Sequence, residues 1–343
     1  MNLIPQKYLK RDSNMELLRI IAMLGILVVH SDFFALGAPT KEDCISAPLV
    51  SAWRYVVENI TIISVNLFVL LSGWYGIHPQ KKRIIEFLFQ ILFFNLLFFV
   101  LFASFMLEET LTRQGVESIF MLDSRFWFVK AYLLLYLLSP ILNSYIEKAP
   151  QRQFKLILLA FFAFQTIYGW LYPSVSWFKF GYSTISFIFI YLLASYLRKY
   201  KEGTEWRSIV LLATYLAFIL LNSAVCYAST FYGRNIYIER LIAYNSPLVI
   251  VASTVVFLFF TRIRFKSGLV NFVAISSFAA FLFQGNYFFV EEVYRPWLRK
   301  WFSADTLTLF SIKAFVFILV IFCLSIMLDK IRIRMWEKVS VKL

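Results

Sequence analysis

Ten long apolar stretches constrain what this chain can fold into more than any other feature of the sequence. A helix needs about 20 apolar residues to cross the roughly 30 Å hydrocarbon core of a bilayer. The alternating pattern of a membrane barrel is absent. The sequence therefore predicts an all-α, polytopic membrane helix bundle that forms a single domain over residues 1–343. The ten stretches are 17–36, 55–77, 84–107, 126–146, 154–172, 180–198, 207–228, 241–261, 269–290 and 306–328.

The composition excludes the main soluble classes. Hydrophobic residues make up 60% of the chain and charged residues 16%, against about 45–50% and 25% in soluble domains. A soluble enzyme, a nucleic-acid binder and a disordered chain are all excluded. The longest connections, 37–54 and 108–125, leave no room for a separate soluble domain. No small-residue cleavage site follows the first stretch, so we expect a retained span.

The basic residues predict an orientation. The net charge is +14, and 21 Lys and Arg fall in the terminal segments and the loops on their side, against ten in the opposite loops. Such clusters between apolar runs record membrane orientation and not a nucleic-acid partner. Because cytoplasmic loops carry the excess of Lys and Arg, we expect both termini in the cytoplasm.

The cysteines and histidines do not indicate a metal site. The three cysteines, Cys44, Cys226 and Cys323, show no C-x-x-C spacing, and the chain has two histidines. These residues do not match the spacing of a zinc site. We expect neither a metal nor a permanently bound cofactor, and we favour unpaired thiols over a Cys44–Cys226 disulfide.

Several polar residues fall inside the apolar stretches, where each is a candidate functional residue because burying it in lipid is costly. We expect most of them at similar depth on the non-cytoplasmic side. A structural alternative is that Lys130 or Lys313 pairs with Glu58 or Asp32 to satisfy packing. The residues on that side are His30, Asp32, Glu58, Lys130, Gln284, Asn286 and Lys313.

Arg19 and His30 form the sharpest pair. They are eleven residues apart, which places them on one helix face about 16 Å apart along the axis. Asn66, Ser72 and Gly73 lie on the cytoplasmic half of the second stretch, where small residues allow a helix or a narrow ligand to approach. Because its unperturbed pKa lies near neutrality, a histidine suits a general base that takes up and releases a proton.

Three segments resemble motifs of the integral-membrane acyltransferase-3 family, which includes O-acetyltransferases of bacterial surface polysaccharides. The first runs from Met15 through Arg19 to His30 and looks like the family's Arg-x10-His signature. The other two are Asn66–Trp74, similar to the second-helix motif, and Phe126–Val129 with Tyr136–Leu142, similar to the fourth-helix pattern. In the ninth stretch many relatives carry Tyr-Leu-x-His, and here Phe281 and Gln284 take the Tyr and His positions.

The resemblance implies transfer of an acyl group, usually acetyl, from cytoplasmic acetyl-CoA or another acyl-CoA to a sugar hydroxyl across the inner membrane. The acceptor would be a surface polysaccharide or a lipid-linked sugar. Arg19 would bind an anionic part of coenzyme A, and His30 would act as general base. Asp32 or Glu58 would orient the imidazole or bind sugar.

Further residues are expected to contact the substrates. The pantetheine arm would pass Asn66, Ser72 and Gly73, and Trp127 would stack on sugar. Further contacts are expected from Lys130, Gln284, Asn286 and Lys313. A transient acyl-histidine intermediate is an open variant of the mechanism.

Two other functions remain open at this point. Polar groups in the membrane also suit a transporter or flippase of a lipid-linked sugar, although no internal repeat is visible. A catalytically idle membrane subunit that holds partner enzymes is the other alternative.

Overall fold

The computed structural model describes residues 11–121, 125–173, 176–203, 205–234 and 238–340, and within these ranges it contains helices, turns and loops but no strand. The predicted all-α class is therefore confirmed. The helices are α1 (Ser13–Val29), η2 (His30–Phe34), α2 (Lys41–Ser46), α3 (Pro48–Thr61), α4 (Ser64–Tyr75), α5 (Lys81–Ala103), α6 (Leu107–Thr110), α7 (Arg113–Ile119), α8 (Trp127–Lys148), α9 (Gln151–Phe164), η3 (Gln165–Leu171), η4 (Lys179–Gly181), α10 (Thr184–Tyr200), α11 (Ser208–Phe231), α12 (Ile238–Leu241), α13 (Pro247–Arg262), α14 (Gly268–Ala274), α15 (Phe278–Gln284), η6 (Phe289–Tyr294), α16 (Arg295–Ala304) and α17 (Leu307–Val339).

Seven helices in the described ranges are long and apolar enough to cross a membrane, fewer than the ten expected. An eighth is added if the pair Gly268–Gln284 and Phe289–Ala304, bent by 76°, counts as one span. The stretches expected at 180–198 and 241–261 form α10 and α13, with 17 and 16 residues. These two helices are shorter than a typical span, so the count of ten stays a prediction, as does the cytoplasmic position of both termini.

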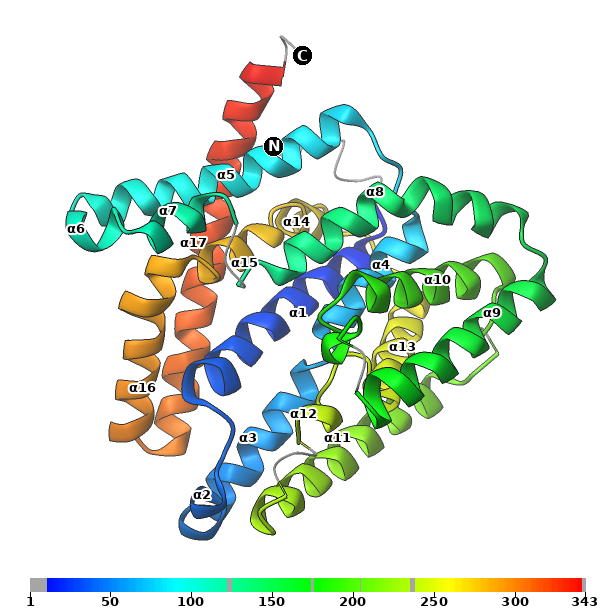
Figure 1. Cartoon of the computed structure of the whole chain (residues 1–343), viewed down its shortest axis with the longest axis horizontal. Helices are drawn as coiled ribbons and strands as arrows, with labels where there is room; N and C mark the ends of the chain where they lie inside the picture. The colour runs from blue at the N-terminus through cyan, green and yellow to red at the C-terminus, as the bar shows by residue number, and fades with distance from the viewer. Residues whose placement is uncertain (1–10, 122–124, 174–175, 204, 235–237, 341–343) are drawn as a thin grey trace.

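Helix α1 lies at the centre of the bundle (Figure 1). It packs against α3, α4 and α13 on one side and against α14, α15 and α17 on the other. Around this centre, α10 packs on α4, α8 and α9, and α11 packs on α3 and α13. The bent pair ends in α16, which lies along α17. Residues on α1 are therefore in reach of segments from most of the chain.

Two glycines allow close helix crossings. A Cβ atom at Gly25 of α1 would overlap the hydroxyl of Ser64, and one at Gly73 of α4 would overlap the backbone carbonyl of Tyr191 on α10. Small residues at such crossings let helix backbones approach closely in lipid, where packing is the main attraction between helices. The expected small-residue contact at Gly73 is thus made with a helix.

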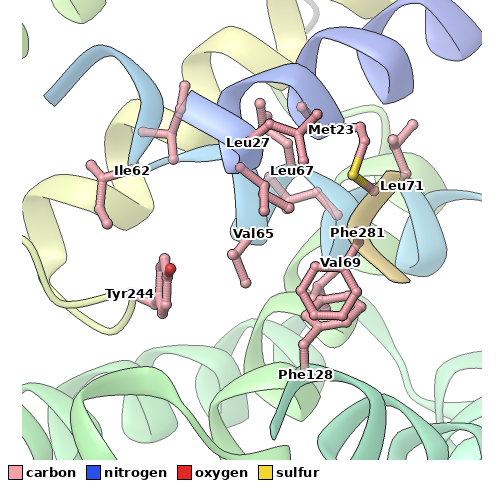
Figure 2. Close-up of a cluster of buried hydrophobic side chains, with 14 of the residues drawn as sticks. Met23, Leu27, Ile62, Val65, Leu67, Val69, Leu71, Phe128, Tyr244 and Phe281 are labelled. Atoms are coloured by element: carbon pink, nitrogen blue, oxygen red, sulfur yellow. The ribbon is translucent and has the colours of Figure 1, made fainter. Parts of the chain in front are cut away.

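The main apolar core lies between α1 and α4. Figure 2 shows Met23 and Leu27 of α1 beside Leu67 of α4, and all three are buried in the same cluster. The cluster continues to Phe128 of α8 and Phe281 of α15, whose rings lie together in Figure 2. This aromatic extension of the core borders the candidate site.

Candidate active site

His30 begins the π-helical turn η2, which ends the first span. Its ring lies 5.4 Å from the ring of Phe34 and 6.2 Å from that of Phe281, measured between centroids. Single π-helical turns in helices are frequent at functional sites. The change from α to π geometry places His30 against α15, a segment about 250 residues away in the sequence.

The hydrogen-bond partner of His30 is Gln284. The His30 Nδ1 atom lies 2.7 Å from Gln284 Oε1. The Gln284 amide nitrogen donates to the Leu27 carbonyl at 3.2 Å and to the hydroxyl of Tyr294. The Tyr294 hydroxyl donates to the same carbonyl at 3.1 Å. The structure thus joins the Gln284 amide to three groups of the protein, and its predicted contact with substrate stays a prediction.

Asp32 pairs with Arg54 and not with His30. The Arg54 Nε atom lies 2.5 Å from Asp32 Oδ1, and Arg54 also donates to the Gly37 carbonyl. Both charged side chains are buried. This ion pair fastens the end of the first span to α3. The expected contact between Asp32 and the imidazole is therefore absent from the described structure.

A cavity of about 490 Å³, the His30 cavity, lies beside the imidazole. Glu58 lines it and is 2% exposed, and its Oε2 atom has no hydrogen-bond partner in the described part of the chain. A buried carboxylate oxygen without a partner is costly unless a ligand or water satisfies it. Glu58 is therefore placed to bind a polar group that enters this cavity.

Aromatic side chains form one wall of the His30 cavity. The Trp127 ring stacks on Tyr244 with centroids 5.7 Å apart and lies 4.4 Å from Tyr182. The Asn66 amide donates to the Tyr244 carbonyl at 2.9 Å, so Asn66 holds this wall and does not line the cavity itself. Trp127 lines the cavity, and its stacking on sugar stays a prediction.

Two further cavities meet around Arg19. The mouth cavity, about 440 Å³, is lined by Arg11, Arg19 and Arg83 among others. The middle cavity, about 230 Å³, lies next to it. Arg19, Ser72 and Tyr132 line both. The Ser72 hydroxyl lies 3.2 Å from that of Tyr132, and Arg19 lies 3.4 Å from Glu16.

Three phenylalanine rings, the aromatic junction, separate the middle cavity from the His30 cavity. Phe128 and Phe278 line the middle cavity, and Phe281 lines the His30 cavity. The Phe281 centroid is 5.8 Å from that of Phe128 and 5.7 Å from that of Phe278. A narrow ligand that extends from Arg19 to His30 must pass these rings.

Three expected substrate contacts lie elsewhere. Lys313 pairs with Asp305 at 2.7 Å, so the suggested pairing of Lys313 with Glu58 or Asp32 is wrong. Lys130 is exposed on α8 and lines none of the three cavities. The Asn286 side chain accepts from the backbone N–H groups of residues 288 and 289 and so caps the bent helix.

Sequence reasoning missed several cavity residues. Tyr132, Tyr182, Tyr244 and Glu239 line the cavities, but aromatic residues in a membrane protein are so common that none stood out. Glu239 lies in a predicted loop, where an acidic residue needs no explanation. No group of three or more metal-binding side chains occurs among the described residues.

The comparison with protein families decides the class of the protein. The sequence model of the acyltransferase domain family matches residues 12–329. The chain belongs to the acyltransferase-3 family. The match covers every helix around the three cavities, and with the apolar helices it makes the protein a multi-pass membrane acyltransferase. Searches of curated proteins and of solved structures gave no match.

Proposed function

We propose that the protein is an O-acetyltransferase that moves an acetyl group from cytoplasmic acetyl-CoA to a hydroxyl of a surface polysaccharide or lipid-linked sugar. The observation that carries the proposal is the order of three cavities along α1. A charged mouth surrounds Arg19, a narrow middle cavity follows it, and the His30 cavity lies beyond the aromatic junction.

The donor fits the Arg19 end. Coenzyme A carries phosphate groups on one end of a long, thin pantetheine arm. The guanidinium groups of Arg11, Arg19 and Arg83 line the mouth, and guanidinium groups bind phosphate through paired hydrogen bonds. The arm passes Ser72 and Tyr132 in the middle cavity and brings the thioester through the aromatic junction to His30. Acyl chains other than acetyl enter by the same route.

The acceptor fits the His30 cavity. Hydrogen bonds to a buried carboxylate and packing on aromatic rings are suitable contacts for a sugar, and Glu58 and Trp127 provide them. The unpaired Glu58 oxygen accepts from a sugar hydroxyl in this arrangement. The other aromatic rings of the wall shield the reaction from water.

In the proposed reaction, the acetyl group passes from the thioester sulfur to the acceptor oxygen, and one proton passes from that oxygen to the sulfur. His30 takes the proton of the acceptor hydroxyl as its oxygen attacks the thioester carbonyl. The carbon–sulfur bond breaks, and the protonated imidazole returns the proton to the leaving sulfur. The products are the sugar ester and free coenzyme A. In the acyl-histidine variant, the imidazole attacks first and the hydroxyl then receives the acetyl group from it.

The proposal is tested by acetyl transfer in membrane vesicles. Radiolabelled acetyl-CoA is supplied on the cytoplasmic face, and the label in glycan is compared between the native protein, His30→Ala and Arg19→Ala at equal expression. Arg113→Ala is a matched arginine control, because Arg113 pairs with Glu117 on an exposed helix surface. We expect label with the native protein and the control, and its loss in both other variants.

Two outcomes contradict the proposal. Equal labelling in all samples excludes His30 as the base. No label in any sample, with the cell's own glycans present, favours the transporter or the idle subunit. The bent helix pair beside the site is the feature that a transporter would share.

A further inference from the structure

Gln284 is placed to control the protonation of His30. It is the last residue of α15, is 1% exposed, and lies directly before the 76° bend. The side chain lines the His30 cavity but directs its amide to the protein.

The neighbours of Gln284 fix which amide atom faces His30. A backbone carbonyl can only accept a hydrogen bond, so the Leu27 carbonyl requires the amide nitrogen on its side. The Tyr294 hydroxyl gives its own proton to the same carbonyl and therefore accepts from the amide nitrogen. Both amide protons are used, and the amide oxygen remains for His30.

The amide oxygen in turn fixes the tautomer of His30. At 2.7 Å from an oxygen that can only accept, Nδ1 must carry a proton. In the neutral imidazole Nε2 is then without a proton. The rings of Phe34 and Phe281 pack against the imidazole and restrict its rotation.

We propose that Gln284 is a positioning residue that holds His30 in the tautomer with the proton on Nδ1, so that Nε2 is the atom that accepts the substrate proton. This inference rests on the proposed function. Leu27 and Tyr294 are the groups that hold Gln284 itself. Because an amide is neutral, it fixes the tautomer without the charge by which a carboxylate stabilises the protonated imidazole.

Other titratable groups also face His30. Asp32, on the same turn, is neutralised by Arg54. Those that line the His30 cavity are Glu58, Arg125, Tyr182, Glu239 and Tyr244, and Arg295 lies over the Phe34 ring. Their charges act equally in the native protein and in a Gln284 variant, so the comparison of the two isolates the effect of Gln284.

The tautomer is measured directly by nitrogen NMR of the full-length protein with labelled histidine. The chain has two histidines, His30 and His78, so the signals absent from His30→Ala belong to His30. We expect a protonated Nδ1 and an unprotonated Nε2 in the native protein, and loss of this preference in Gln284→Leu. A proton on Nε2 in the native protein, or unchanged signals in Gln284→Leu, would overturn the inference.

Kinetics give a second readout. We expect Gln284→Leu to lower kcat about tenfold, the factor of one net hydrogen bond, with little change in KM. Gln165→Leu is the matched control, because Gln165 is 1% exposed and lines none of the three cavities.

In Gln284→Glu, a carboxylate beside Nδ1 favours the protonated imidazole, so the acid limb of the pH–rate profile moves to higher pH by about one unit or more.

The failures of the two proposals are distinguishable. Full activity of His30→Ala removes the proposed base, whatever the tautomer. Loss of activity in His30→Ala with an unchanged acid limb in Gln284→Glu removes only the role of Gln284.

Discussion

The two ends of α1 differ in the exposure and charge of their polar residues. At the Arg19 end, the arginine side chains are partly exposed, and Arg19 and Arg11 both lie near the buried Glu16. At the His30 end the polar groups are buried, and His30 is held by a neutral amide. Exposed charges attract and release a charged ligand, whereas buried groups in fixed positions suit proton transfer. Under the proposed function, the first span separates donor binding at Arg19 from proton transfer at His30.

The largest expected effects are a fall in kcat on substitution of His30 and a rise in KM on substitution of Arg19. His30→Ala removes the proposed proton acceptor and should lower kcat by about 10²- to 10⁴-fold. Arg19→Ala should mainly raise the KM for acetyl-CoA, by about tenfold, because it removes a charged contact to the donor. Steady-state kinetics of both variants in vesicles measure this. Equal effects of both substitutions on KM alone would break the comparison between the two ends.

The next effect concerns the buried ion pair at the His30 end. Arg54→Ala leaves the buried Asp32 side chain without its partner, and we expect it to destabilise the protein by about 3–5 kcal/mol. Thermal unfolding in detergent measures the loss. The double variant Asp32→Asn with Arg54→Met removes both charges and should recover most of the stability. If Arg54→Ala has the same unfolding temperature as the native protein, this ion pair does not stabilise the end of the first span.

A smaller effect is expected at the aromatic junction, where the two ends meet. Phe128→Leu replaces one ring between the cavities by a smaller side chain and should ease the passage of longer acyl chains. Because one methylene in an apolar site changes discrimination by at least about tenfold, the ratio of butyryl to acetyl transfer should rise by about that factor. Competition between the two acyl-CoA donors measures it. An unchanged ratio would show that the Phe128 ring does not limit the length of the acyl chain.

The smallest effect lies outside the membrane-spanning segments. Asp43 accepts from the backbone N–H and hydroxyl of Thr40 in a helix cap of α2, and the backbone hydrogen bond holds the pKa of Asp43 below its usual value. Its stabilising contribution is therefore present above the usual carboxylate pKa and is lost as the pH falls through the lowered pKa. Asp43→Ala should cost about 1 kcal/mol at neutral pH.

The measurement is unfolding of Asp43→Ala and the native protein at several pH values. The difference between them should disappear in strong acid, while acetyl transfer at neutral pH stays unchanged. A loss of transfer would show that the exposed surface beyond the His30 end also takes part.

The sequence predicted what depends on local spacing. Arg19 and His30 lie on one helix face because eleven residues fit three helical turns, and both line cavities along α1. The partners of the buried groups could not be predicted in this way. Gln284 is 254 positions from His30, and Arg54 is 22 positions from Asp32 on another helix. Such contacts depend on how helices cross, which no periodicity records.

The span count shows the same limit. Hydropathy identifies an apolar stretch but not where its helix breaks, so the bend after Gln284 was not predicted. The polar residues Asn286 and Lys313 fall in apolar stretches of the sequence, but their partners are a backbone turn and Asp305.

The bend after Gln284 has a mechanical consequence. Gln284 lies on one arm of the bent helix and Tyr294 on the other, and both are tied to the Leu27 carbonyl of α1. A hinge movement that separates the arms must break the hydrogen bond between Gln284 and Tyr294 or the bond from one of them to the Leu27 carbonyl. The angle of the bend is therefore coupled, through one backbone carbonyl of α1, to the hydrogen bonds that surround His30.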